Sequence, residues 1–555
     1  MSELKKIYGI DLGTTYSAIS IVNDHGEAEI IKNSDGDSIT PSVVYIENPD
    51  NIVVGKVAKE QKSIFPEQAV EFVKRQMGDE NAKFQILGQS YTPVEISSFI
   101  LKRIVKDAEA LRGEEIKDVV ITCPAYFGEK ERVATRQAGE MAGLNVVRIL
   151  DEPVAAALAY GLNSMAGETK NILVYDLGGG TFDITVLHIE NGEIRVVCTE
   201  GDHKLGGADW DQRLINYFVS EFERQLPDSA EGITDDPETK ADLQQKAETV
   251  KHQLSKVETT KVAIVHNGEK LKLDITREIF DGLTQDLLEK TISMTDAVLQ
   301  TAANLETPIT HFDEFLLVGG STRMPQVIEA TKNRYGSQLG IEPRQFDPDE
   351  AVSKGAALFG YIEYVKGVVQ KVVNESSNAG STPNDAKVIQ QAAAQLGLSS
   401  GKVEKLLTTK LVFAATKTYG IEVLDQNDPN KSMIENMIFR QEPLPYSYTQ
   451  TFGTVVANQP AVNMKVYSSN TQDHSEKQIE LYAGELIGEA ILTIQAGLPM
   501  GAPIEVTFEL QPDGTLKVTG KDLTGGNVLE SEYKVGMDEA EVEAARKRVD
   551  GLKIT

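Results

Sequence analysis

Two segments far apart in the chain carry the same residues that could bind a phosphate. Residues 8–22 read YGIDLGTTYSAISIV, and residues 174–187 read VYDLGGGTFDITVL. In both, an apolar strand-like run ends at an aspartate and a glycine-bearing turn follows. Without a Cβ, glycine lets backbone N–H groups approach an anion closely. Asp11 and Asp176 stand at matching points, where carboxylates can hold a hydrated Mg²⁺ that in turn holds phosphates.

Hydroxyl groups extend this pattern, because Thr14, Thr15 and Thr181 can donate hydrogen bonds to phosphate oxygens. A single Asp-Leu-Gly segment is most often an ordinary turn. Two copies with matching flanks favour two related lobes instead, each presenting one hairpin to a ligand in the cleft between them. The repeat therefore predicts a nucleotide site in a two-lobed cleft.

Two other features are ambiguous on their own. GGSTR at 319–323 follows the apolar run FLLV, and its two glycines would let a base or ribose lie against the backbone. A helical pattern comes next, so the same residues also suit an ordinary strand-to-helix turn. Lys74 lies in the helix-like segment EFVKRQMG, where a lysine is usually solvated. Neither feature is decisive by itself.

The elements that must position these residues alternate between strand-like and helix-like patterns over residues 1–365. Short apolar runs that end in glycine, such as NILVYDLGGG, are typical of buried strands, and EKERVATRQAGEMAGL carries apolar residues at helical spacing. This alternation predicts an α/β domain. Residues 366–410 are expected to contain a linker and a small helical insert. The linker comes first and is rich in Ser, Asn and Gly, and the insert follows it within the same range.

The pattern changes again after this insert. From 411 to 535 apolar and polar residues alternate between turns, which predicts an all-β domain. Residues 536–555 are expected to form one short helix, because Asp538 and Glu541 have the spacing of a capping box. A helix of this length is a single rod and cannot form a bundle.

Composition limits the class of function. The 555 residues include 84 acidic and 55 basic side chains, for a net charge of −29, so no basic excess exists to displace the counterions of nucleic acid. No run of about 18 apolar residues could span a membrane, and no apolar signal segment begins the chain. The two cysteines, Cys123 and Cys198, lie in apolar strand-like runs, which disfavours a disulfide. We expect a cytoplasmic protein.

Together these segments resemble the heat-shock seventy-kilodalton (DnaK-type) chaperone family. IDLGTTYS and DLGGGTFDI resemble its two phosphate motifs, and VGGSTRMP resembles its adenosine motif. The connecting stretch CPAYFGEKERVATRQAGEMAGLNVVRILDEPVAAALAYG and the segments GDHKLGGADWD and DPDEAVSKGAA are also similar to the family. The resemblance implies an α/β, two-lobed, actin-like ATPase domain, followed by an all-β sandwich that binds peptides and by a truncated helical lid.

The resemblance also implies roles for residues at matching positions. Asp11, Glu152 and Asp176 would surround Mg²⁺, and Lys74 would lie beside the γ-phosphate. Asp183 would help to place the attacking water or a monovalent cation such as K⁺. The residues implied to bind ATP or ADP are Gly13, Thr14, Thr15, Tyr16, Gly178, Gly179, Gly180, Thr181, Gly206, Gly207, Glu248, Lys251, His252, Ser255, Gly319, Gly320, Ser321, Arg323 and Asp349.

Three further positions bear on nucleotide affinity and on coupling. Pro124 and Arg132 match the family's proline switch and relay arginine, which pass the nucleotide state to the peptide domain. His252 occupies a position where many members have an arginine that stacks on adenine; imidazole could stack too, or face solvent. The residues implied to form the peptide pocket are Ile421, Val423, Leu424, Phe452, Val455, Val462 and Met464.

The implied function is that of an ATP-dependent molecular chaperone, active in protein folding and the stress response. It would hydrolyse ATP to ADP and phosphate and bind extended hydrophobic segments of unfolded clients, with a J-domain cochaperone and a nucleotide exchange factor as partners. Two departures favour an alternative. TTKLVF replaces the family's acidic, leucine-rich linker, and the lid is reduced to one expected helix. The alternative is an ATP-binding, weakly hydrolysing regulatory protein or cochaperone. A sugar kinase or filament former is disfavoured by the β-domain.

Overall fold

The two phosphate-type hairpins lie at matching places in two sheets of the same topology. Lobe I, residues 6–151, has the strand order β11-β10-β1-β2-β3, and lobe II, residues 170–345, has the order β18-β17-β12-β13-β14. In each sheet the three strands around the hairpin are antiparallel, and the two strands beyond them are parallel. The predicted duplication of α/β lobes is therefore confirmed.

The computed structural model describes residues 6–161, 169–305, 307–375, 382–383, 385–425, 428, 430–471, 473–511, 514–533 and 539–555. The first five residues, much of the predicted linker, and Asp538 of the predicted capping box lie outside this set.

Lobe I combines its main sheet with a smaller outer sheet, β6-β5-β7. Helices α2 and α3 pack together on this lobe. Its elements are β1 (Tyr8–Asp11), β2 (Tyr16–Val22), β3 (Ala28–Ile31), β4 (Thr40–Pro41), β5 (Val44–Asn48), β6 (Asn51–Val54), α1 (Lys56–Lys62), β7 (Ala69–Val70), β8 (Phe84–Ile86), β9 (Gln89–Tyr91), α2 (Pro93–Arg112), β10 (Asp118–Cys123), α3 (Glu129–Met141) and β11 (Asn145–Asp151).

Local sequence accounts for the bounds of α2. The Glu95 backbone N–H donates to Thr92 Oγ1 at 3.2 Å, and the Thr92 N–H donates to the Glu95 carboxylate at 2.9 Å, which completes a capping box. Pro93 opens the first turn, where its missing N–H costs nothing. Gly113, with φ 67°, ends the helix in the left-handed region.

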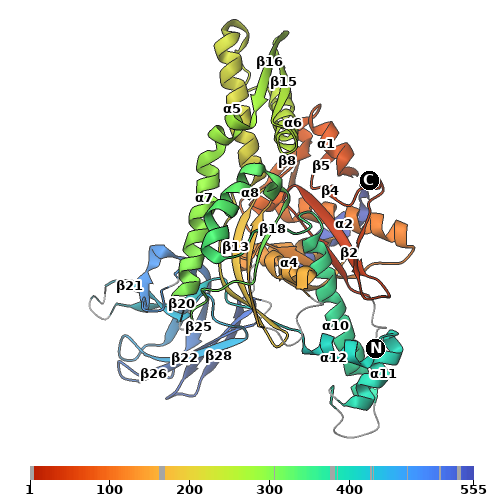
Figure 1. Cartoon of the computed structure of the whole chain (residues 1–555). Coiled ribbons are helices and arrows are strands. Elements are labelled where there is room, and N and C mark those ends of the chain that lie inside the picture. Colours follow the sequence, from red (N-terminus) through yellow and green to blue (C-terminus); the bar gives the residue numbers. More distant parts are fainter. Residues whose placement is uncertain are drawn as a thin grey trace.

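In Figure 1 a long helix and a hairpin of lobe II rise above its sheet, and α7 (Arg277–Ala303) runs alongside the sheet and packs on β13 and β14. The elements of lobe II are β12 (Lys170–Leu177), β13 (Phe182–Glu190), β14 (Glu193–Asp202), α5 (Gly207–Gln225), α6 (Pro237–Leu254), β15 (Thr259–His266), β16 (Glu269–Thr276), α7 (Arg277–Ala303), β17 (Glu314–Val318), α8 (Pro325–Thr331), α9 (Ser337–Leu339) and β18 (Arg344–Gln345).

Two helices join the lobes beneath the cleft. Helices α4 (Glu152–Gly161) and α10 (Ala351–Glu375) pack on each other and share a core with strands of both sheets. The predicted boundary at residue 365 falls inside α10, which runs on to Glu375. The insert follows as α11 (Ala386–Leu396) and α12 (Ser400–Thr408), whose apolar faces pack on the lower end of α10 (Figure 1).

The β-domain, residues 418–533, is a sandwich of two antiparallel sheets with one shared core. One sheet has the order β24-β21-β20-β23-β25 and the other β22-β26-β27-β28. Its strands are β20 (Thr418–Leu424), β21 (Ser432–Ile438), β22 (Tyr446–Gly453), β23 (Ala461–Ser469), β24 (Gln478–Glu480), β25 (Gly484–Thr493), β26 (Pro503–Leu510), β27 (Leu516–Asp522) and β28 (Val528–Tyr533).

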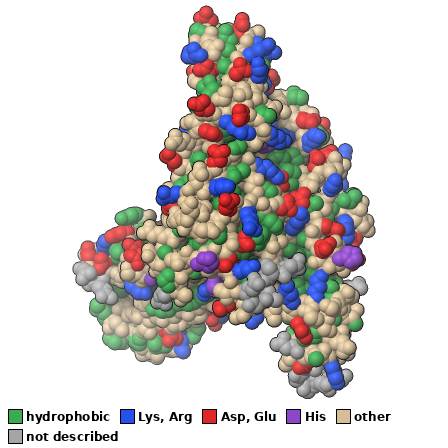
Figure 2. Space-filling view, viewed as in Figure 1, with side chains coloured by type: hydrophobic (Ala, Val, Ile, Leu, Met, Phe, Trp, Pro, Cys, Tyr) green, Lys and Arg blue, Asp and Glu red, His purple; other side chains and the backbone are tan. Residues whose placement is uncertain are grey.

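The C-terminal residues form helix α13 (Glu539–Gly551) and the short strand β29 (Lys553–Ile554). The sequence predicted the helix as a truncated lid, but α13 packs against α2 and α3 of lobe I. Cys123 and Cys198 are buried free thiols, as predicted. Within the described ranges no helix is both long and apolar enough to cross a bilayer. Figure 2 shows acidic and basic side chains interspersed over one face.

Candidate nucleotide-binding site

A cavity of about 820 Å³ lies between the lobes, which is large enough for a nucleotide. Most of the residues predicted to bind nucleotide line it; the predicted residues that are not among the lining residues are Gly180, Asp183, Gly206 and Gly207. The predicted residues in the wall are Asp11, Gly13, Thr14, Thr15, Tyr16, Lys74, Glu152, Asp176, Gly178, Gly179, Thr181, Glu248, Lys251, His252, Ser255, Gly319, Gly320, Ser321, Arg323 and Asp349.

The two hairpin turns touch each other at the floor of this cavity. A Cβ added to Gly179 would collide with Thr15 Oγ1, and one added to Gly180 would collide with Thr14. The glycines are therefore needed for the approach of the two lobes, in addition to the approach of an anion. Thr15 Oγ1 is buried and has no hydrogen-bond partner among the described residues. Such a hydroxyl suits a phosphate oxygen.

The acidic residues of the floor lie close enough together to raise one another's pKa. Burial and the nearby charge of Glu152 raise the pKa of Asp11 to about 7. Burial, Glu152 and Asp11 likewise raise the pKa of Asp176. Asp183 accepts a hydrogen bond from the Ala125 N–H at 3.2 Å, and burial with the charge of Glu152 raises its pKa well above the usual value.

This surplus of negative charge is a chemical fit for a bound cation. Among the described residues, however, no three His, Cys, Asp or Glu side chains are grouped closely enough to ligate a metal by themselves. A Mg²⁺ ion would therefore need water and phosphate oxygens as further ligands, as Mg²⁺ commonly does.

Lys74 is buried, with only 4% of its surface exposed, and its Nζ lies 2.5 Å from Glu152 Oε1. Burial disfavours its charge, but Glu152 and Asp11 outweigh that cost and raise the pKa of Lys74 above its usual value. Lys74 therefore keeps its positive charge in the cavity wall. The solvent-exposed side chain that is usual for a lysine on a helix is not what the structure shows. Lys74 belongs to a short 3-10 turn, Val73–Gln76.

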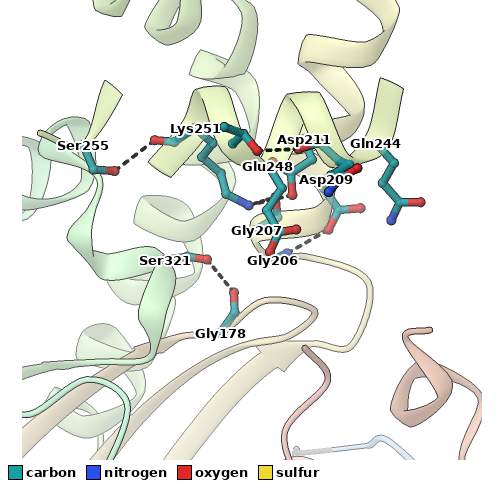
Figure 3. Close-up of polar contacts among 12 residues, drawn as sticks. Gly178, Gly206, Gly207, Asp209, Asp211, Gln244, Glu248, Lys251, Ser255 and Ser321 are labelled. Atoms are coloured by element: carbon teal, nitrogen blue, oxygen red, sulfur yellow. Dashed lines mark hydrogen bonds and ion pairs between the residues drawn. The ribbon is translucent and has the colours of Figure 1, made fainter. Parts of the chain in front are cut away.

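The GGSTR segment both turns the chain and lines the cavity. Gly319 has φ 83°, and a Cβ there would approach Asp176 Oδ1 to 2.5 Å. Ser321 Oγ donates to the Gly178 carbonyl at 2.9 Å, which fixes this turn against the second phosphate hairpin (Figure 3). Arg323 pairs with Asp349 at 2.6 Å at the outer edge.

Helix α6 supplies the opposite wall through Glu248, Lys251 and His252, and Ser255 follows directly after the helix. His252 lines the cavity, and burial together with the charge of Lys251 lowers its pKa, so its imidazole is neutral at pH 7. Stacking of His252 on adenine remains a prediction.

Two charged residues of the cavity wall, Lys59 and Asp211, were not singled out from the sequence, because single charged residues on helices are usually solvated. Asp211 pairs with Lys251 at 2.6 Å, and Figure 3 shows Lys251 reaching from α6 to Asp211 on α5. Lys251 Nζ also donates to the Gly207 carbonyl at 2.9 Å. Across the cleft, Lys59 pairs with Glu248 at 2.6 Å. These contacts hold the walls of the cavity in place.

The predicted coupling residues form a chain from the cleft to the β-domain. Arg132 donates to the Ala125 carbonyl at 3.0 Å and pairs with Asp151 at 2.6 Å, and Ala125 in turn contacts Asp183. Pro124 immediately precedes Ala125. Arg132 also lines a small cavity shared with Phe413 and with Tyr419 of the β-domain.

The unrecognised linker forms strand β19 (Lys410–Val412), which extends the lobe II sheet by pairing in parallel with β14. Beyond it, the Phe413 ring lies 4.9 Å from the Arg148 guanidinium. Arg440 of the β-domain is buried and donates to the Thr199 carbonyl of β14 at 3.0 Å. The edge of lobe II therefore holds both the linker and the β-domain.

The predicted peptide-pocket residues lie on strands β20 and β23 and on and beside β22, but they differ in exposure. Ile421 and Met464 are buried between the sheets. Leu424 and Val455 are 39% and 45% exposed. The residues that pack partly buried against the same core are Val423, Phe452 and Val462. A client-binding role for this set remains a prediction.

Comparison with known proteins gives one consistent result. The family described as Hsp70 protein matches residues 7–373 and 361–550. The chaperone protein DnaK of Thermotoga neapolitana is 39% identical over 534 residues, covering 95% of this chain and 80% of that protein. DnaK of Thermotoga maritima is 38% identical over 97% of this chain and 83% of its own length. DnaK of Halobacterium salinarum is 35% identical over 94% and 74%.

Proposed function

The chain belongs to the Hsp70 family of ATP-dependent chaperones, and we propose that it hydrolyses ATP in the cleft and binds extended apolar segments of unfolded proteins through its β-domain. The observation that carries this proposal is the pair of glycine turns that touch across the cleft beside the buried Lys74–Glu152 ion pair. Phosphoryl transfer depends mainly on positioning and on charge neutralisation, which is the chemistry that these residues offer.

Each residue of the floor has a role in this proposal. The turn N–H groups and the hydroxyls of Thr14, Thr15 and Thr181 hold the phosphates, and the Lys74 ammonium faces the γ-phosphate. Asp183, whose pKa is raised by burial, accepts a proton from the attacking water and contributes to a K⁺ site. Asp11, Glu152 and Asp176 would hold Mg²⁺ through its water molecules, and the bound ion would neutralise phosphate charge.

The β-domain contributes client binding. A strand-like peptide would gain affinity from backbone hydrogen bonds and selectivity from a pocket near Leu424 and Val455. The contacts of β19 and Arg440 with β14 support a coupling of this domain to the cleft. A J-domain cochaperone and a nucleotide exchange factor are proposed partners, on the basis of family membership.

Single-turnover ATP hydrolysis tests the proposal. We expect Lys74→Ala to slow hydrolysis by about 100-fold, because the variant removes a preorganised charge from the transition state. The control Lys261→Ala changes a lysine that is 84% exposed on the β15–β16 hairpin, and it should keep the rate of the unmodified protein. Equal rates in Lys74→Ala and Lys261→Ala would contradict the assignment. ATP binding without hydrolysis in the unmodified protein would favour the regulatory alternative instead.

A further inference from the structure

Phe72 has an unusual backbone conformation directly before the 3-10 turn that carries Lys74. Its φ is 59° and its ψ is 26°, which places it in the left-handed region. In that region a Cβ crowds the following carbonyl oxygen, so aromatic residues rarely adopt it. Among the residues that the structure describes, Phe72 is the only aromatic one with a positive φ. Such outliers persist only where surrounding contacts require them, and they gather at active sites.

The chain before Phe72 is held by both walls of the cleft. Val70 belongs to β7, which pairs with β5 in lobe I. Glu71 forms an ion pair with Lys62 of α1 and accepts a hydrogen bond from Gln244 Nε2 of α6 at 3.1 Å. Lys62 Nζ also donates to Gln244 Oε1 at 2.7 Å. These contacts leave the chain little freedom where it reaches Phe72.

The chain after Phe72 is held as firmly. Val73 is only 2% exposed and belongs to the hydrophobic core of lobe I. Arg75 Nε donates to the Gly180 carbonyl of the second phosphate hairpin at 2.9 Å, and the Arg75 N–H donates to the Phe72 carbonyl at 3.1 Å. Lys74 lies between these two anchored residues. Its direction therefore depends on the backbone angles of Phe72.

A different backbone conformation at Phe72 would move Lys74. Rotation of φ from 59° to about −60°, where residues with a Cβ are relaxed, would swing the following turn by about 120°. Val73 and Arg75 are anchored, so Lys74 would have to absorb part of this movement. In the present structure Lys74 Nζ lies 2.5 Å from Glu152 Oε1. A displacement of about 1 Å at a catalytic group can slow a reaction by about 100-fold.

The Phe72 ring supplies contacts that stabilise this conformation. The side chain is half-buried and lines the nucleotide cavity. Lys62 Nζ lies 5.8 Å from the ring centroid, within the range of a cation–π contact. Glycine would adopt the same backbone conformation without strain, but it has no side chain to offer Lys62. The ring thus compensates in part for the strain of the backbone.

We propose that Phe72 is a positioning residue for ATP hydrolysis. Its left-handed backbone directs Lys74 into the cleft, toward the place of the γ-phosphate, and its ring stabilises that backbone through Lys62. Phe72 itself makes or breaks no bond in the reaction. Because Lys74 owes its role in hydrolysis to the proposed function, the role of Phe72 rests on that function as well.

Two variants that differ by a single carbon test this role. Phe72→Gly and Phe72→Ala both remove the ring, but only alanine has a Cβ, which is strained in the left-handed region. We expect single-turnover hydrolysis at saturating ATP to be about fivefold slower in Phe72→Ala than in Phe72→Gly. The β-branched Phe72→Val should be slower still, because valine avoids this region most strongly. Equal rates in Phe72→Gly and Phe72→Ala would overturn the proposal.

Leu87 offers a matched control, because it also has a positive φ, 49°, in the hairpin turn between β8 and β9 of lobe I. Its side chain is 48% exposed. Leu87→Gly and Leu87→Ala make the same pair of changes there, and both should hydrolyse ATP at the rate of the unmodified protein. A difference between them as large as that at residue 72 would reveal a general cost of strain and contradict a special role of Phe72.

A double-mutant cycle tests whether Phe72 acts through Lys74. In the Lys74→Ala background, Phe72→Ala should hydrolyse ATP at the rate of Phe72→Gly within about twofold, because no lysine remains to be misplaced. A difference of about fivefold in that background as well would show that Phe72 acts elsewhere, and the positioning role would be wrong.

Crystal structures of nucleotide-free Phe72→Gly and Phe72→Val test the geometry without hydrolysis, and Phe72→Ala replaces Phe72→Val if the latter does not fold. We expect Lys74 Nζ to remain beside Glu152 in Phe72→Gly and to move by about 1 Å or more in Phe72→Val. An unmoved Lys74 in Phe72→Val would contradict the positioning role. A displaced Lys74 in a chain that does not hydrolyse ATP would contradict the proposed function alone, so the two failures are distinguishable.

Discussion

Gly179 and Gly180 contact Thr15 and Thr14 of the opposite lobe. The backbone of both hairpin turns therefore borders the space in which the phosphates are expected to bind. Sequence alone predicted these residues, because the duplicated turn is a local pattern whose chemistry does not depend on the rest of the fold. It could not predict that the glycines serve the contact between lobes, since that contact joins residues that are far apart in the chain.

Gly179→Ala should abolish tight nucleotide binding, because its Cβ would push Thr15 and the opposing lobe away. Calorimetric titration with ADP should show a loss of affinity of at least about 100-fold, as expected when a close backbone approach is lost. Gly282→Ala is the control, because it lies in α7 with open space around its Cβ and should raise stability by about 0.5–1 kcal/mol. Similar ADP affinity in both variants would contradict this account of the turns.

We expect Asp211 to act on the nucleotide through Lys251, with which it forms an ion pair. Burial, opposed by the charge of Lys251, raises the pKa of Asp211 to about 6. As pH falls below 6, Asp211 gains a proton, the ion pair weakens, and nucleotide affinity should fall. Asp211→Asn should have about tenfold weaker affinity at pH 7.5, the scale of one charge-assisted hydrogen bond, and it should lose the part of the pH dependence centred at about pH 6.

Fluorescent ADP titrations between about pH 5 and 8 would measure this effect. Asp286→Asn, which breaks the exposed pair with Arg213, is the control and should keep the profile of the unmodified protein. An unchanged pH profile in Asp211→Asn would exclude the role of Asp211 in positioning Lys251.

At the scale of elements, local patterns predicted the strands and helices of both lobes, but the linker was missed. Strand β19 pairs with β14 through backbone groups, which any sequence able to adopt an extended conformation can offer. The absence of the family's acidic, leucine-rich sequence therefore did not mean the absence of docking. Strand β29 was missed for the same reason: a two-residue strand carries no period, and its partner β6 lies about 500 residues earlier in the chain.

Phe413→Ala should weaken the docking of β19, because it removes the ring beside Arg148. A cation–π contact of about 0.5–1 kcal/mol corresponds to a two- to fivefold effect, so exchange at 410–412 should accelerate by about that factor. Lys387→Ala changes an exposed residue of α11 and serves as the control. If exchange at 410–412 is the same in Phe413→Ala and Lys387→Ala, the Phe413 ring does not stabilise the linker strand.

At the scale of the whole molecule, the cleft, the linker strand and the β-domain form one connected path. Asp183 contacts Ala125, Arg132 contacts Ala125, and Arg132 lines the cavity that Phe413 and Tyr419 share. We therefore expect a nucleotide that shifts the floor of the cleft to bias the contacts that hold the β-domain. The sequence analysis kept impaired coupling open as an alternative, because the family's acidic, leucine-rich linker is not recognisable; the pairing of β19 with β14 favours intact coupling.

The most direct test of this account is the rate at which a bound hydrophobic peptide dissociates from the full chain with and without ATP. We predict that ATP accelerates dissociation by at least about tenfold, because a binding energy difference of about 1.4 kcal/mol between the two states of the β-domain suffices for that factor. Dissociation at the same rate with and without ATP would contradict the claim that the cleft controls peptide binding.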